Sequence, residues 1–196
     1  MEHNLTLTKY SAGDVSEITG LPPVMQRDWR RKGFLPEIGE GHARFDAFGL
    51  CEIWARRLFL DQGIKPSVSG EASKLCSFAI VARALVSPQA YQPADERAAS
   101  PTHNEAENYR NHILRQMHSK IPERHLPMIL KTPRFFVWFS NGDTSWGDGL
   151  DDIFTRRLPN IKNGPAVVLD LHRQATDLLR EAGELARVSS QERVEA

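Results

Sequence analysis

Residues 10–36, YSAGDVSEITGLPPVMQRDWRRKGFLP, contain the start and stop signals of two short helices. Ser11 can cap a helix that begins at Ala12, and Gly20 can end that helix in a left-handed conformation. The proline pair that follows favours the first turn of a second helix, which we expect over residues 22–32. Two short helices joined by a turn that contains glycine are typical of a helix-turn-helix.

The second expected helix has two chemically different faces. On a wheel of 100° per residue, an inward apolar stripe is formed by Leu21, Met25 and Trp29. The opposite arc and its flank carry polar and basic candidates for contact with a polyanion, namely Pro23, Gln26, Arg27, Arg30 and Arg31. In a helix-turn-helix such a face enters the major groove of DNA, where Arg contacts guanine edges or phosphates. A solvated basic face on a structural helix is the alternative, since runs of charge are common.

The residues after this helix predict a small hairpin and a third helix. Residues 35–45 contain two glycines between apolar residues, which indicates a hairpin or wing, with His42 and Arg44 placed to contact DNA. Asp46 can cap the third helix, which we expect to end at Gly63. The order helix, turn, basic helix, wing, helix predicts a winged helix-turn-helix.

The same ordered features resemble the DNA-binding domain of MerR-type regulators over residues 10–66. The matching positions are Tyr10, Gly20, Arg27, Trp29, Gly33, Phe34, Leu35, Arg44, Phe45, Leu60, Gly63 and Ile64. The resemblance implies a transcriptional regulator that reads DNA with the helix at 22–32 and the wing at 35–45. Three positions depart from the family pattern: Gln26 replaces a usual leucine, Asp28 stands where an aromatic residue is common, and Ser16 replaces a usual alanine.

The sequence divides into three expected segments, and its predicted fold class is mainly α with small β. Residues 1–66 form the winged helix-turn-helix domain, and residues 67–102 form a helix, over 67–87, followed by a Pro-rich linker. Residues 103–196 predict a C-terminal α+β region with a strand hairpin and a closing helix. We expect this last region to serve dimerisation or effector binding.

Periodicity gives the elements of the C-terminal region. Residues 104–120 have helical spacing of apolar side chains. RFFVWFS at 134–140 and AVVLDL at 166–171 are buried strands, and the Asn-Gly pair at 141–142 predicts a hairpin turn. Residues 172–188 predict an amphipathic closing helix.

Composition excludes several classes of function. The 196 residues include 25 Lys and Arg against 25 Asp and Glu, so any attraction for DNA must be local. The two cysteines form no ligand cluster, and no signal peptide or membrane span is expected, which predicts a cytoplasmic protein. Residues 141–152 resemble a calcium loop, but Trp146 occupies the position where the turn requires glycine. We therefore expect no cofactor, no metal and no enzymatic activity.

We expect a sequence-specific transcriptional regulator whose partner is double-stranded DNA. The alternative is an architectural DNA-binding protein of a phage or mobile element, of the excisionase or small terminase type, and a DNA-acting enzyme is a weaker third reading. We also expect a homodimer held by residues after 66, and a small-molecule or protein effector for the C-terminal region. These readings differ in what they predict on DNA: one symmetric site, several bent sites, or a requirement for a divalent metal.

Overall fold

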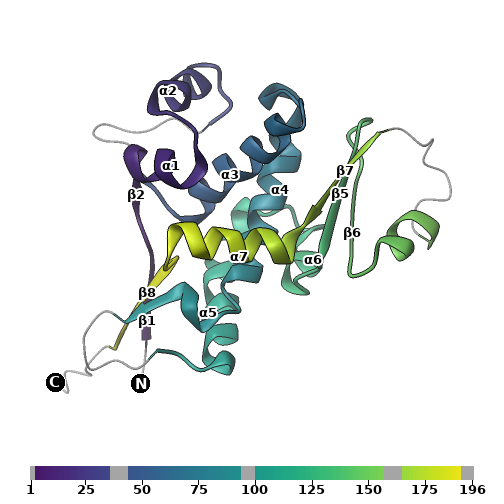
Figure 1. Ribbon diagram of the computed structural model, residues 1–196. Helices are drawn as coiled ribbons and strands as arrows, with labels where there is room; N and C mark the ends of the chain where they lie inside the picture. The colour runs from purple at the N-terminus through teal and green to yellow at the C-terminus, as the bar shows by residue number, and fades with distance from the viewer. Residues whose placement is uncertain (1–2, 36–43, 94–99, 157–164, 191–196) are drawn as a thin grey trace.

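The computed structural model describes residues 3–35, 44–93, 100–156 and 165–190. In these ranges the fold is mainly helical with three small sheets, as Figure 1 shows, which confirms the expected fold class at this coarse level. No helix within the described ranges has the length and apolar character that crossing a bilayer requires.

The first two helices begin and end where the local signals predict. Helix α1 spans Ala12–Thr19, and helix α2 spans Pro23–Arg31. The Ser11 hydroxyl accepts a hydrogen bond from the Asp14 amide, and the Asp14 carboxylate accepts one from the Ser11 amide, which forms a capping box. Gly20 ends α1 with a φ of 68°, a conformation that glycine adopts without strain.

The segment after α2 pairs differently from a simple hairpin. Residues 34–35 form a bend, and residues 36–43 lie outside the described part of the chain. Strand β3 (Arg44–Phe45) pairs antiparallel with strand β2 (Tyr10–Ser11) just before α1. The expected hairpin over 35–45 would need a strand at Phe34 and Leu35, and these residues form none. Strand β3 instead takes its backbone partners from the residues that lead into α1.

Helices α3 (Ala47–Asp61) and α4 (Pro66–Ala84) form the centre of the molecule. Asp46 caps α3 by accepting a hydrogen bond from the Gly49 amide. Helix α4 packs against α3, α6 and α7, and every residue from Leu75 to Ala82 is buried. A stretch of helix that is buried all round must be covered on every side, so the second half of α4 belongs to the core.

One sheet joins the two ends of the described chain. Its strand order is β1 (His3–Leu7), β8 (Ala186–Ser190), β4 (Tyr91–Pro93), with β8 antiparallel to β1 and parallel to β4. This finding corrects two predictions. The closing helix ends at Ala182, not at 188, and residues 88–93 form a short 3-10 turn and β4 instead of a linker.

A second sheet contains the predicted hairpin. Its order is β6 (Thr144–Gly147), β5 (Phe135–Phe139), β7 (Ala166–Asp170), and both pairings are antiparallel. Gly142 in the turn has a φ of 92°, a conformation that glycine adopts without strain. The remaining elements are α5 (His103–Gln116), a 3-10 turn (His118–Lys120), α6 (Leu126–Leu130), a π-helical turn (Asp152–Arg156) and α7 (Leu171–Ala182).

A continuous hydrophobic core crosses both expected segment boundaries. Buried residues of α1, α3, α4, α5, α7 and the strands belong to one cluster. Two polar contacts tie the N-terminal helices to the C-terminal region: the Tyr10 hydroxyl donates to the Glu184 carbonyl at 2.9 Å, and the Trp54 indole donates to Gln174 at 3.0 Å. The N-terminal 66 residues therefore share their core with the rest of the chain.

Candidate nucleic-acid interface

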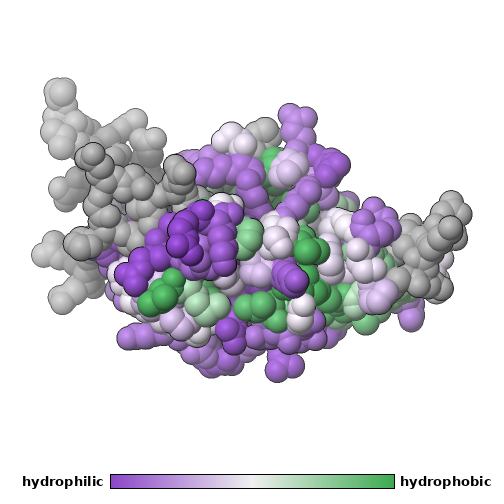
Figure 2. Space-filling view, turned by 90° about the horizontal axis from the view of Figure 1, so that it is seen from above, coloured by the Kyte–Doolittle hydropathy of each residue, from purple (hydrophilic) through white to green (hydrophobic). Residues whose placement is uncertain are grey.

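The outward face of α2 consists of Pro23, Val24, Arg27 and Arg31, all of which are exposed. Figure 2 views the molecule from above Figure 1, where α2 lies, and shows strongly hydrophilic residues gathered in that region. Val24 is 64% exposed, and sequence reasoning did not select it. Val24 lies three residues before Arg27 and seven before Arg31, a spacing that places all three on one face of a helix and could have identified it.

Arg30 connects α2 to strand β3. Its guanidinium carbon lies 5.4 Å from the centre of the Phe45 ring, within the range of a cation–π contact. Burial, and then the charge of Arg27, lower the pKa of Arg30, although a guanidinium remains protonated in proteins. Its Nε atom is buried and has no hydrogen-bond partner among the described residues.

Asp28 partly neutralises the end of α2. Its carboxylate lies 2.7 Å from the Arg31 guanidinium and 2.7 Å from the Lys32 amine. Hydrogen bonds from Lys32 and then Arg31 lower the pKa of Asp28, so the carboxylate stays charged. Arg27 has no ion-pair partner in the described part of the chain. Its charge is therefore the most available one on this helix.

Gln26 does not lie on the outward face, and its expected contact with DNA is wrong. The side chain is 0% exposed. Its Nε2 donates to the Ala12 carbonyl at 3.0 Å and to the Leu21 carbonyl at 2.9 Å. Gln26 therefore holds the start of α1 and the inter-helix turn against α2, and Met25, which was expected inside, is only half-buried.

The other predicted residues fall into two groups. Trp29 is 4% exposed, which confirms that the ring faces inward. Arg44 is exposed in β3 and precedes Phe45, whose ring contacts the Arg30 guanidinium. His42 and most of the predicted wing at 35–45 lie outside the described residues, so their contacts stay predictions.

Other kinds of chemistry find little support in the described residues. Within these ranges, no group of three or more His, Cys, Asp or Glu side chains could hold a metal ion. Cys51 and Cys76 are buried free thiols, and burial raises the pKa of each. A buried thiol with a raised pKa is a poor nucleophile and a poor metal ligand at neutral pH.

No protein-family model matches the chain, and no curated protein matches it significantly. The resemblance to MerR-type DNA-binding domains therefore stays a prediction from its residues. What this surface can bind is inferred from the charge and geometry of α2 and β3.

Proposed function

We propose that the protein is a sequence-specific DNA-binding regulator that inserts α2 into the major groove. The observation that carries this proposal is the exposed basic face of α2, a helix whose Arg30 contacts Phe45 of β3, on a chain whose total charge is zero. A local basic patch on a short helix that follows a turn is what major-groove recognition requires. Arg27 is exposed and has no ion-pair partner among the described residues, so its charge is available to DNA.

The exposed residues have distinct roles in this proposal. Arg27 contacts a base edge or a phosphate, and Val24 is available to contact a thymine methyl group. Arg30, positioned by Phe45, adds its positive charge to a phosphate contact. Arg44 binds the adjacent backbone or minor groove, with His42 as a further candidate in the wing.

We further propose that two copies bind together. A single small DNA-binding module buries only about 600–1,000 Å² on DNA, and such modules gain specificity by occupying two half-sites. The C-terminal region supplies the dimer contact or an effector site in this view. Sedimentation of the full chain at micromolar concentration tests it, and a monomer both free and bound to DNA would contradict it.

The decisive experiment begins with selection of DNA ligands from a random pool by the full-length protein. Affinity and its salt dependence are then measured for the wild type, Arg27→Ala and the control Arg115→Ala. Arg115 is likewise exposed on a helix, α5, and belongs neither to α2 nor to β3.

We expect Arg27→Ala to lose about 1–3 kcal/mol if it reads a base, or to lower the salt slope by about one if it binds phosphate. Arg115→Ala should bind as the wild type does. Equal affinity and equal salt slope for all three proteins would refute the recognition role of α2. Selection of several repeated sites with strong bending would instead favour an architectural protein.

A further inference from the structure

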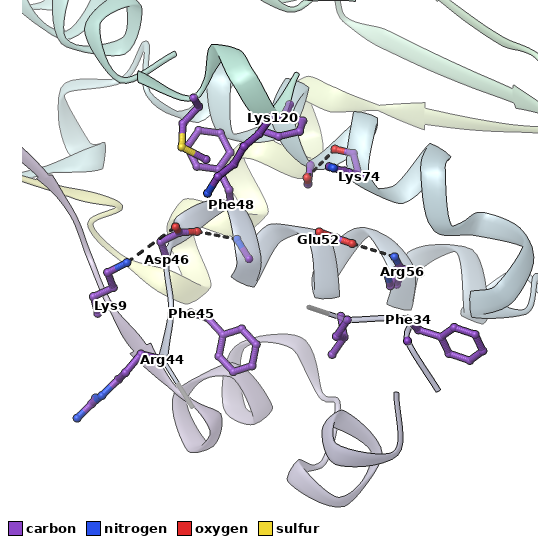
Figure 3. Close-up of a pocket in the computed structure, with 16 residues that line it drawn as sticks. Lys9, Phe34, Arg44, Phe45, Asp46, Phe48, Glu52, Arg56, Lys74 and Lys120 are labelled. Carbon is purple, nitrogen blue, oxygen red and sulfur yellow. Dashed lines mark hydrogen bonds and ion pairs between the residues drawn. The ribbon is translucent and has the colours of Figure 1, made fainter. Parts of the chain in front are cut away.

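A cavity of about 670 Å³ opens beside α3, and its lining residues are drawn in Figure 3. One face of α3, with its capping residue, forms the floor through Asp46, Gly49, Glu52 and Arg56. β3 and residues 33–35 lie on one side, and α4 with residues of the α5 end lies on the other. We call this cavity the α3 pocket. Its volume is within the range of about 300–1,000 Å³ that small-molecule sites occupy.

The walls of the α3 pocket are aromatic. Four phenylalanines contribute to the lining: Phe34, Phe45, Phe48 and Phe78. The Phe48 and Phe78 rings lie 5.3 Å apart at an angle of 46°, and both are almost fully buried. Ring surfaces that open into a cavity from both sides suit a flat apolar group, which gains from aromatic contact beyond the area it buries.

The rim of the α3 pocket has an excess of positive charge. Five cationic residues line it, Lys9, Arg44, Arg56, Lys74 and Lys120, against two carboxylates. Both carboxylates are already engaged: Asp46 caps α3 and lies 3.9 Å from Lys9, and Glu52 lies 2.8 Å from Arg56. Lys74 and Lys120 are exposed and form no ion pair with any described residue. Since the whole chain is neutral, this local excess indicates an anionic ligand.

Arg56 is the buried cationic residue among those that line the α3 pocket. The residue is only 6% exposed, although it lines the α3 pocket. Its two terminal nitrogens donate to the Pro66 carbonyl and to Glu52, but its Nε is buried without a partner among the described residues. A buried donor left unpaired costs about 1–3 kcal/mol, and a bound water molecule would offset that cost.

We propose that the α3 pocket binds a small aromatic organic anion. Its ring lies against the phenylalanines, and its acid group faces the unpaired amines of Lys74 and Lys120. If the proposed function holds, the ligand also regulates DNA binding, because the Phe45 ring both lines the α3 pocket and contacts the Arg30 guanidinium of α2. A ligand that shifts Phe45 therefore alters the basic face of α2, and DNA affinity changes with it.

The site is tested without DNA by titrating the full-length protein with 1-anilinonaphthalene-8-sulfonate, an aromatic anion that fluoresces in apolar surroundings. N-phenyl-1-naphthylamine, which has the same rings without the sulfonate, is the matched neutral probe. We expect saturable binding of one sulfonate per chain, and at least tenfold weaker binding of the neutral probe. Equal affinity for the two probes, or no saturable binding of the sulfonate, would overturn the proposal.

Two variants locate the bound probe. Lys74→Gln/Lys120→Gln should raise the Kd of the sulfonate at least tenfold, while Lys131→Gln, an exposed lysine away from the α3 pocket, should leave it unchanged. Gly49→Leu fills the cavity from its floor and should abolish binding. A Cβ at Gly49 would make only ordinary contacts, at 3.6 Å or more, with the side chains of Asp46 and Phe45. Unchanged binding in either pocket variant would refute the assignment.

The consequence for DNA is measured separately. The sulfonate is added to the complex of the protein with its selected DNA, and the Kd of the DNA should change for the wild type but not for Gly49→Leu. A wild type that binds the sulfonate as described but binds no DNA would refute the proposed function and support the α3 pocket. A wild type that binds DNA but not the sulfonate would refute the α3 pocket and support the proposed function.

Discussion

Gln26→Glu should destabilise the protein strongly and in a pH-dependent way. The side chain is fully buried, and its amide donates to the Ala12 and Leu21 carbonyls. A glutamate of the same shape would direct a carboxylate at two carbonyl oxygens that need donors. A buried charge with no partner costs about 3–5 kcal/mol, so the loss should be in this range at pH 8.

The sign of the pH dependence follows from burial. An unpaired carboxylate in an apolar site has a pKa raised above the ordinary value of about 4.3, because burial penalises the charged form. The folded state of Gln26→Glu therefore binds the proton more tightly than the unfolded state does. Its stability is greatest below about pH 4.3 and is lost as pH rises through the raised pKa, so its deficit relative to the wild type should widen from pH 5 to pH 8.

Urea unfolding followed by tryptophan fluorescence measures this deficit at each pH. Val24→Glu is the matched control, because it places the same charge on the same helix at a residue that is 64% exposed. The control should stay within about 0.5 kcal/mol of the wild type at both pH values. Gln26→Leu should lose about 1–3 kcal/mol at every pH, since it removes two hydrogen bonds without adding charge. A Gln26→Glu variant as stable as Val24→Glu at pH 8 would show that the side chain faces solvent.

Three further outcomes can be measured by the same unfolding assay. Trp29→Ala should lose about 3–5 kcal/mol, because the ring is 4% exposed; a melt like that of the wild type would contradict this. Tyr10→Phe should lower the free energy of unfolding by about 1 kcal/mol, because it removes the 2.9 Å hydrogen bond to the Glu184 carbonyl, and an unchanged free energy would argue against that hydrogen bond. Burial raises the pKa of Asp170, but hydrogen bonds from the Arg173 amide and Arg134 outweigh it and leave the pKa below the usual range. Asp170→Ala should therefore cost about 1 kcal/mol at pH 7, and this cost should fade below about pH 3.9, where a depressed carboxyl pKa ceases to stabilise the fold.

Elements with strong local signals were predictable from the sequence. The caps at Ser11 and Asp46 need only neighbouring amides, and the left-handed glycine at 20 needs only its own backbone freedom. The Asn-Gly hairpin and the strands on either side of it follow from a turn type and a run of aromatic and β-branched residues. In each case the determinant lies within a few residues of the element.

Strand β8 could not be predicted in this way. Residues 184–188 continue the apolar spacing of α7. A single glycine is tolerated within an amphipathic helix, so Gly183 did not mark the end of this one. The segment is extended because β1 and β4 hold it from both sides, and β1 lies at the opposite end of the chain. Pairing over such a distance leaves no trace in a local window.

The candidate site shows the same limit on a smaller scale. The helical wheel correctly assigned Trp29 to the buried face and Arg27 to the exposed face, but it assigned Gln26 to the exposed face, where the structure has it buried. The buried face of a helical wheel is chosen by the hydrophobic residues on it, so a polar residue such as glutamine is assigned to solvent. Carbonyl groups at the start of α1 and in the turn reverse that preference, because they reward a buried amide donor.

The shared core has a consequence for how α2 can work. A DNA-reading unit on a flexible linker would respond to the rest of the protein only through its local concentration. Here α3 packs on α4, α4 packs on α7, and β1 pairs with β8, so α2 stands on a scaffold that includes both ends of the described chain. Packed interiors shift between discrete arrangements rather than deform smoothly. A ligand bound beside α3 therefore needs no separate relay to reach α2, because Phe45 and the helices that line the α3 pocket already form the support of the basic face.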